Sequence, residues 1–134
     1  MEAIDKKTIL IADDDQDFRL QLRIQLEGAG FEVLAAGGRL EAEALLQERH
    51  IDLAIVDLMM EEVDGGFALC HRIKRKDPSI PVILVTAVTS ETGLEFDAAT
   101  KEERSWVKAD ALVDKPVRFE QLTREIDRLL GENA

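Results

Sequence analysis

The sequence predicts an α/β fold in which five parallel strands form one sheet and helices cover both of its faces. Short, nearly all-apolar runs recur along the chain, and between them lie longer segments whose apolar residues recur at helical spacing. A strand that is apolar at every position is typical of a parallel sheet buried on both faces. Strands that alternate with helices favour right-handed crossovers, which place the helices on both sides of the sheet.

The expected strands are the short apolar runs. The first, Thr-Ile-Leu-Ile-Ala at 8–12, is followed by acids, and the third ends in an acid, Asp57. The fourth is the most hydrophobic of the set. In chain order, the strands are expected at 8–12, 31–35, 52–57, 81–86 and 111–113.

The expected helices lie between and after these strands. The first shows one apolar stripe at four-residue spacing, formed by Phe18, Leu22 and Leu26. Asp15 or Asp17 should cap its start, and Gly28 with Gly30 should end it. Residues 60–66 should form a polar loop. Helices are expected at 17–29, 40–47, 67–76 and 118–130, with further helix inside the polar stretch 88–110.

Length and charge limit the class of protein. The 134 residues are the usual size of one domain, and 46% of them are hydrophobic, enough for a core. We find no linker or repeat, so we expect a single domain over 1–134, with its core at about 7–130 and no output domain. The 17 basic and 28 acidic residues give a net charge of −11. That balance argues against binding nucleic acid unaided or an anionic membrane surface.

The few cysteines and histidines exclude further classes. One cysteine and two histidines allow no disulfide framework and argue against a Cys/His metal cage. The first residues contain no apolar run long enough for a signal peptide, and no stretch approaches 18 apolar residues. We therefore expect a cytoplasmic protein. Cys70 is expected to be a small buried hydrophobic residue.

Polar side chains follow four of the five expected strands. In an open α/β sheet, ligands bind outside the carboxyl ends of the strands. Three aspartates at 13–15 follow the first strand, Asp57 ends the third, Thr86 ends the fourth and Lys115 comes after the fifth. In a parallel sheet, several carboxylates, one hydroxyl and one ammonium group therefore share one edge.

A cluster of carboxylates favours a divalent cation. Two unit charges 4 Å apart repel by about 4 kcal/mol at an effective dielectric constant near 20. A few protein oxygen ligands suit Mg²⁺, which keeps several water ligands. Mg²⁺ beside a threonine and a lysine indicates a phosphoryl group, whose oxygens the two cations would neutralise. One carboxylate could then be the nucleophile that becomes an acyl phosphate.

Each of these residues also has an ordinary structural explanation. An aspartate after a strand is usually a turn residue or a helix cap. Thr86 suits a strand because it is β-branched, and Lys115 suits a solvated surface. The coincidence of four strand ends is what indicates a functional site.

With these residues in view, the chain resembles a bacterial two-component response-regulator receiver domain over about 7–130. The motifs that carry the resemblance are, in order, Asp13-Asp14-Asp15, Asp57-Leu58-Met59-Met60, Asp64-Gly65, Thr86-Ala87 and Asp114-Lys115-Pro116. The resemblance implies a flavodoxin-like, doubly wound sheet with strand order 2-1-3-4-5. It also implies a phosphoacceptor switch that is no enzyme beyond slow self-dephosphorylation.

The resemblance implies a role for each acidic residue of the site. Asp57 would accept a phosphoryl group from the phosphohistidine of a sensor histidine kinase or a histidine phosphotransfer protein. Asp14 and Asp57 would ligate Mg²⁺ together with the backbone carbonyl of Met59. Asp13 would act on the metal through water.

It also implies how the signal leaves the site. Thr86 would bond the new phosphoryl group and Lys115 would pair with it. The Lys115-Pro116 peptide bond would be cis. Phosphorylation would bias a two-state equilibrium and alter the surface of 88–110, 111–113 and 118–130, through which a homodimer could form.

The chain departs from the family pattern in three places. Glu61 stands where the family usually has proline, and Leu112 stands where it often has an aromatic switch residue. The stretch between Thr86 and Lys115 is longer than usual. We interpret this extension as a solvated loop; the sharper hypothesis is a lid or partner surface with apolar anchors, Phe96 and Trp106.

Two other functions stay open at this point. A Mg²⁺-dependent aspartyl phosphatase would use an Asp-x-Asp pair such as Asp13 and Asp15, but 134 residues leave no room for its cap domain, and Asp57 would have no role. A degenerate receiver would act only as a protein-interaction module, which Glu61 and Leu112 keep plausible. Both rank below the phosphorylatable receiver because all of its chemical residues are present.

Overall fold

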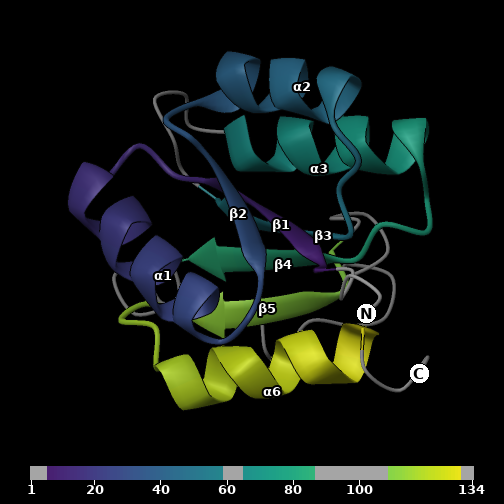
Figure 1. The fold of residues 1–134 in the computed structure, drawn as a ribbon. Coiled ribbons are helices and arrows are strands. Elements are labelled where there is room, and N and C mark those ends of the chain that lie inside the picture. Colours follow the sequence, from purple (N-terminus) through teal and green to yellow (C-terminus); the bar gives the residue numbers. More distant parts are fainter. Residues whose placement is uncertain (1–5, 59–64, 87–108, 131–134) are drawn as a thin grey trace.

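The computed structural model describes residues 6–58, 65–86 and 109–130, and within them it forms one parallel sheet flanked by helices (Figure 1). The strand order is β2-β1-β3-β4-β5, the order that the resemblance implies. The strands are β1 (Thr8–Ala12), β2 (Glu32–Ala36), β3 (Leu53–Asp57), β4 (Val82–Thr86) and β5 (Ala111–Asp114). The predicted fold class is therefore confirmed.

Four helices lie in the described part of the chain. Figure 1 shows α1 and α6 on one face of the sheet, with α2 and α3 on the other. They are α1 (Gln16–Gly28), α2 (Arg39–Glu48), α3 (Gly65–Lys76) and α6 (Phe119–Leu130). The further helix expected inside 88–110 falls on residues 87–108, which lie outside the described residues. Among the helices described, none is both long and apolar enough to cross a membrane.

Every residue of β1, β3 and β4 is buried, which explains why these strands read as continuous apolar runs. Successive side chains alternate between two apolar layers, as the pleat requires. In β1, Leu10 packs in the layer under α2 and α3, whereas Ile9 and Ile11 pack in the layer under α1 and α6. Both faces of the sheet thus contribute to the core.

The end of α1 explains why the second strand begins at Glu32 rather than at the expected residue 31. Gly30 has φ 102°, a left-handed conformation that glycine adopts without strain. Its N–H donates to the carbonyl of Glu27, and the N–H of Phe31 donates to that of Leu26. This pair of bonds is a Schellman motif, so the amide of Phe31 closes the helix instead of entering the sheet.

The start of α3 corrects another expectation. Gly65 and Gly66 were expected in the loop 60–66 but are helical, so α3 begins two residues before the expected residue 67. The N–H of Gly66 donates to the carbonyl of Leu58 at 3.0 Å, which brings the helix start against the end of β3. The remaining bounds differ from expectation by one residue at most.

A partly exposed ion pair anchors the amino ends of β4 and β5. Lys74 Nζ, near the end of α3, lies 2.8 Å from Asp110 Oδ2 and 2.6 Å from the carbonyl oxygen of Ile80. The same carboxylate oxygen accepts the N–H of Val82 at 2.8 Å, and the N–H of Asp110 donates to the carbonyl of Val82 at 2.8 Å. The residue before β5 is thereby tied both to α3 and to β4.

Cys70 is fully buried on α3, as expected, and this predicts an inert thiol. Burial raises the pKa of Cys70 to about 12, so that only about one molecule in 10⁴ is a thiolate at pH 8. We expect iodoacetamide to leave the native protein unmodified at pH 8 and to alkylate it fully in urea, measured by intact mass. Fast alkylation of the native protein would mean that α3 does not stay packed on the sheet.

Candidate functional site

The predicted site residues lie at the carboxyl ends of four neighbouring strands. Asp13 follows β1, Asp57 ends β3, Thr86 ends β4 and Lys115 follows β5. The parallel ladders pair Asp57 with Val85, and Thr86 with Asp114. The four residues therefore lie on adjacent strands of the sheet, in the order β1, β3, β4 and β5. The expectation that this sheet edge collects the polar side chains is confirmed.

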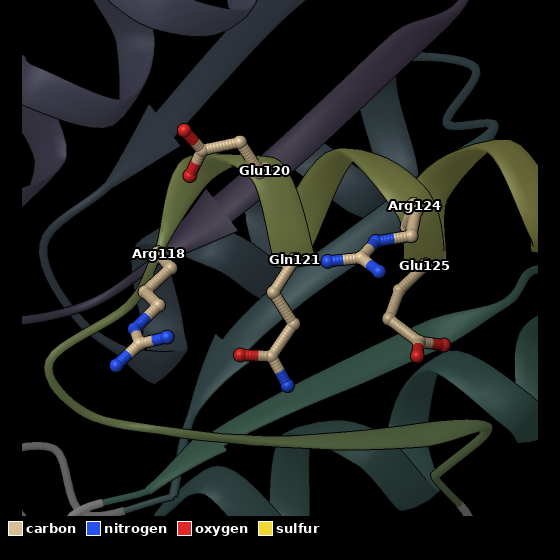
Figure 2. A pocket seen from close by; sticks show the side chains of 5 residues that line it. All are labelled: Arg118, Glu120, Gln121, Arg124 and Glu125. Carbon is tan, nitrogen blue, oxygen red and sulfur yellow. The ribbon is translucent and has the colours of Figure 1, made fainter.

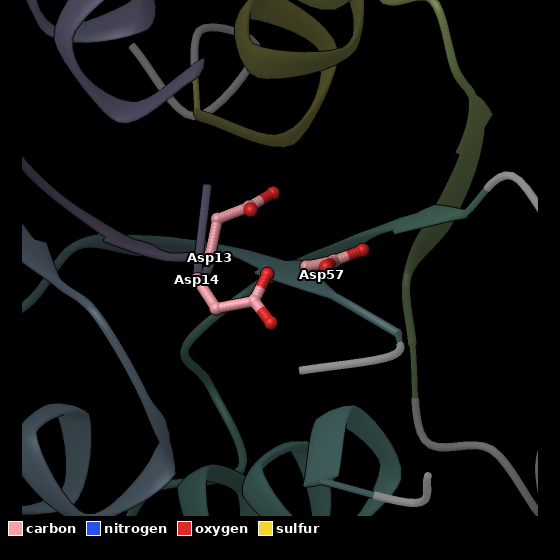
Figure 3. Close-up of side chains that lie close together, drawn as sticks. All are labelled: Asp13, Asp14 and Asp57. Atoms are coloured by element: carbon pink, nitrogen blue, oxygen red, sulfur yellow. The ribbon is translucent and has the colours of Figure 1, made fainter. Parts of the chain in front are cut away.

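Three aspartates form the acidic cluster, which we define as Asp13, Asp14 and Asp57. Each offers one carboxylate oxygen within 4.8 Å of the others, and Figure 3 shows the three side chains gathered at the strand ends. Asp13 is 1% exposed and Asp57 6%, whereas Asp14 is exposed. Two of the three charges are therefore buried, which makes their mutual repulsion stronger than it would be in water.

The buried carboxylate of Asp13 is only partly hydrogen-bonded. Its Oδ1 accepts the N–H of Asp15 at 2.8 Å, but its buried Oδ2 accepts no hydrogen bond from the described residues, although Lys115 Nζ lies 3.2 Å away. Burial raises the pKa of Asp13, and the Asp15 N–H and the Lys115 charge lower it only in part. The ionised form is thus under-stabilised, as in a site that a cation completes.

The donor set of the cluster fits a hard divalent cation. It consists of carboxylate oxygens alone, and the exposed side chain of Asp14 leaves one side open to water. Few protein oxygens and room for water are what Mg²⁺ requires. A cation there would add to the single positive charge that Lys115 brings to Asp13, and it would offset the repulsion between the carboxylates.

Lys115 supplies the positive charge of the site. Its Nζ lies 3.2 Å from Asp13 Oδ2 and 3.6 Å from Asp57 Oδ1, and its side chain is 25% exposed. Burial lowers the pKa of Lys115, but the carboxylates of Asp13 and Asp57 outweigh it and hold the pKa above its ordinary value. The side chain is therefore an ammonium ion at neutral pH.

Backbone hydrogen bonds hold these residues in register. The N–H of Lys115 donates to the carbonyl of Thr86 at 2.9 Å, and the N–H of Asp13 donates to the carbonyl of Ala36 at 3.1 Å. Thr86 itself is 1% exposed at the end of β4. The Lys115-Pro116 peptide bond is cis, as the resemblance implies.

Asp15 caps α1 and does not belong to the acidic cluster. Its Oδ1 accepts the N–H of Asp17 at 3.0 Å and that of Phe18 at 3.2 Å. The expectation that one of Asp15 and Asp17 caps this helix is confirmed, with Asp15 in that role. The phosphatase alternative loses support, because its Asp-x-Asp pair would need Asp15 in the site.

Three further residues that the sequence analysis did not assign to the site touch its members. The ring centroid of Phe18 is 4.8 Å from Lys115 Nζ, and Arg19 donates from Nη1 to the carbonyl of Asp13 at 2.8 Å. A Cβ on Gly66 would lie 2.3 Å from the carbonyl oxygen of Asp57. The doubled glycine Gly65-Gly66 is a signal of close backbone approach that could have pointed to Gly66.

Some sequence predictions fall on residues that the structure does not describe. Met59 and Glu61 lie in 59–64, and the anchors Phe96 and Trp106 lie in 87–108, all outside the described residues. Leu112, by contrast, is half-buried on β5 and packs against the apolar layer under α2 and α3. It therefore lies at the edge of the apolar core in this structure.

A surface hollow of about 590 Å³ lies along α6, away from the acidic cluster. Figure 2 shows the side chains that line it: Arg118, Glu120, Gln121, Arg124 and Glu125. They offer two positive and two negative charges and none of the residues of the acidic cluster. Their chemistry does not select a ligand, so the hollow does not compete with the sheet edge as the functional site.

Comparisons with known proteins identify the family of the chain. The response regulator receiver domain family matches residues 9–127. The probable transcriptional regulator ycf27 of Galdieria sulphuraria is 41% identical over 133 residues, covering 96% of this chain and 50% of the relative. The virulence transcriptional regulatory protein PhoP of Salmonella typhimurium is 32% identical over 126 residues, covering 94% and 53%. The chain thus spans about half the length of these curated relatives.

Solved structures give the same result. A CheY-like response regulator receiver domain protein from Methanospirillum hungatei JF-1 superposes with a TM-score of 0.79 at 27% identity, covering 96% of both chains. The response regulator protein TrrA of Thermotoga maritima, in complex with Mg²⁺-BeF, has a TM-score of 0.73 at 28% identity, covering 92% of this chain and 99% of that chain. The chain therefore belongs to the response regulator receiver domain family of two-component signal transduction.

Proposed function

We propose that Asp57 is a phosphoacceptor that takes a phosphoryl group from the phosphohistidine of a partner protein. The observation that carries this proposal is the position of its carboxylate, at the end of a buried strand, 3.6 Å from the Lys115 ammonium and within the acidic cluster. A buried carboxylate beside a fixed positive charge suits attack on a phosphoryl group, whose charge the ammonium offsets.

The proposed transfer requires only a proton in addition to Asp57 and the phosphohistidine. An oxygen of Asp57 gives an electron pair to phosphorus, while the bond between phosphorus and the donor's imidazole nitrogen breaks. That nitrogen keeps the bonding pair and takes a proton from the solvent. Lys115 pairs with the phosphoryl oxygens, and the Thr86 hydroxyl donates a hydrogen bond to one of them.

The residues present would hold Mg²⁺ in this site. Asp14 and Asp57 would be direct ligands, with the backbone carbonyl of Met59, and Asp13 would act through a water molecule. Bound there, Mg²⁺ supplies charge neutralisation of the phosphoryl oxygens. The under-stabilised carboxylate of Asp13 supports this assignment.

We propose a sensor histidine kinase or a histidine phosphotransfer protein as the donor, in the cytoplasm. Phosphorylation would bias an equilibrium between two conformations that differ in the surface of 88–110, β5 and α6. A homodimer could form through this surface. Relatives of twice this length are named transcriptional regulators. We infer that this domain controls transcription only through another domain or partner, and does not bind nucleic acid by itself.

The test is phosphorylation by a small donor. With acetyl phosphate and Mg²⁺, we expect the intact mass to rise by one phosphoryl group, and the Asp57→Asn variant to show no adduct. Asp127→Asn, which removes an exposed carboxylate from α6, should behave like the wild type. The absence of an adduct in a wild-type protein that binds Mg²⁺ would contradict the proposal and favour a pure interaction module. Sustained turnover of a phosphomonoester would favour the phosphatase.

A further inference from the structure

The ring of Phe18 covers the ammonium group of Lys115. Its centroid lies 4.8 Å from Nζ, inside the distance of about 6 Å at which a cation is attracted to an aromatic face. We propose that Phe18 is a positioning residue, which holds the Lys115 ammonium between Asp13 and Asp57 for phosphoryl transfer. This inference rests on the proposed function of Asp57.

Phe18 is itself held in place by the first turn of α1. Its N–H donates to the Asp15 cap at 3.2 Å, and its half-buried side chain packs against the core layer that contains Leu22 and Leu26. Those two residues, one and two turns further along the helix, are buried against the sheet. These contacts therefore hold the ring in one position near the carboxyl end of β1.

The contacts around Lys115 close into a circuit. The N–H of Asp15 donates to Asp13 Oδ1 at 2.8 Å, and Asp13 Oδ2 lies 3.2 Å from Lys115 Nζ. Lys115 in turn lies over the ring of Phe18, whose own N–H returns to Asp15. A lysine side chain is flexible, with a compact charge on a four-carbon stem. The ring removes one direction in which that charge could leave the carboxylates.

This position has two opposite effects on the chemistry. An ammonium group held 3.2 Å and 3.6 Å from the carboxylates stands where phosphoryl oxygens would arrive, and it also competes with a metal ion for the same oxygens. Loss of the ring should therefore slow phosphorylation while leaving Mg²⁺ affinity unchanged or stronger. Simple damage to the fold would weaken both.

The experiment compares three variants with the wild type. Phe18→Leu keeps an apolar side chain without the aromatic face, Phe18→Tyr keeps the face, and Leu20→Ala alters an exposed residue of the same helix, 57% exposed. Rate constants for phosphorylation by acetyl phosphate at saturating Mg²⁺ come from intact mass, and the Mg²⁺ dissociation constant comes from calorimetry. We expect Phe18→Leu to be about three- to tenfold slower with no loss of Mg²⁺ affinity. Phe18→Tyr and Leu20→Ala should stay within about twofold of the wild type, since neither removes the ring face.

The contact can also be measured without the reaction. Protons on the ε carbon of Lys115 should resonate upfield in the wild type and in Phe18→Tyr, because they lie in the ring current, and return downfield in Phe18→Leu. The absence of that upfield shift in the wild type would overturn the inference. So would a wild type that is phosphorylated no faster than Phe18→Leu. A parallel loss of rate and Mg²⁺ affinity in Phe18→Leu also overturns it. Failure of the wild type to form any adduct instead refutes the proposed function, and the ring-current shift then still reports the contact.

Discussion

Replacing Gly66 by alanine is expected to lower the free energy of unfolding by about 2–4 kcal/mol and to slow phosphorylation of Asp57. A Cβ at this position would lie 2.3 Å from the carbonyl oxygen of Asp57 and 2.5 Å from both Cα and the carbonyl oxygen of Leu58. These are backbone atoms of Asp57, the last residue of β3, and of Leu58, the residue after it, so no side chain can rotate away to make room. Either α3 moves outward or the end of β3 does, and both disturb the site.

The control for this variant is Gly28→Ala. A Cβ on Gly28, the last residue of α1, would meet no atom within 4 Å apart from its chain neighbours and the backbone of its own helix. Because alanine favours a helix over glycine, Gly28→Ala should leave stability unchanged or raise it by up to about 1 kcal/mol. Urea unfolding and acetyl phosphate labelling of both variants provide the measurement. Equal stability of the two would show that α3 does not press on β3 as described.

Replacing Asp13 by asparagine should stabilise the protein without Mg²⁺, by about 1–2 kcal/mol at pH 7. Asp13 is 1% exposed, lies beside two other carboxylates, and has one oxygen that accepts no hydrogen bond from the described residues. Asparagine removes the buried charge at nearly the same volume. The contact with Lys115 weakens, but Asp57 remains 3.6 Å from that ammonium.

The pH dependence of this difference follows from the direction of the pKa shift. Burial raises the pKa of Asp13 above its ordinary value of 3.8, so the folded state binds a proton more readily than the unfolded chain. The stability linked to that proton is fully present below the ordinary pKa and is lost as the pH rises through the raised one. The advantage of Asp13→Asn should therefore be largest at neutral pH and shrink as the pH falls through the raised pKa.

Mg²⁺ should make the wild type more stable than the Asp13→Asn variant. A ligand that binds only the folded state stabilises it in proportion to the logarithm of its concentration over its dissociation constant. Loss of a residue that acts on the metal through water costs about 10- to 100-fold in metal affinity. Thermal unfolding across a Mg²⁺ titration should show the wild-type curve rising past that of Asp13→Asn. A wild type less stable than the variant at every Mg²⁺ concentration would mean that Asp13 has no part in holding the metal.

The sheet and most of the site were predictable because they depend on patterns that are local in the sequence. Apolar runs such as 8–12 and 52–57 mark strands buried on both faces, and a parallel arrangement then brings Asp13, Asp57 and Lys115 together without any knowledge of their side-chain contacts. The position of Asp15 at the helix start likewise follows from a general preference of helix caps.

What could not be predicted depends on contacts between segments distant in the chain. Phe18 reads as one more member of an apolar stripe, and only the distance between its ring and Lys115 Nζ shows that the two are in contact. Gly66 reads as part of a loop until the distance between α3 and β3 is known. The bond from Phe31 to Leu26 shifts a strand start by one residue for the same kind of reason, since it depends on the conformation of Gly30.

The contacts of Asp110 with Lys74 and Val82 fix the start of β5 independently of the number of residues between β4 and β5. Thr86 is fixed at the end of β4, and Asp110 is fixed where β5 is about to begin, so both ends of the intervening segment are set by the sheet. A change in the number of residues between these two points therefore leaves both of them fixed, and Lys115, five residues after the anchor, keeps its place beside Asp57.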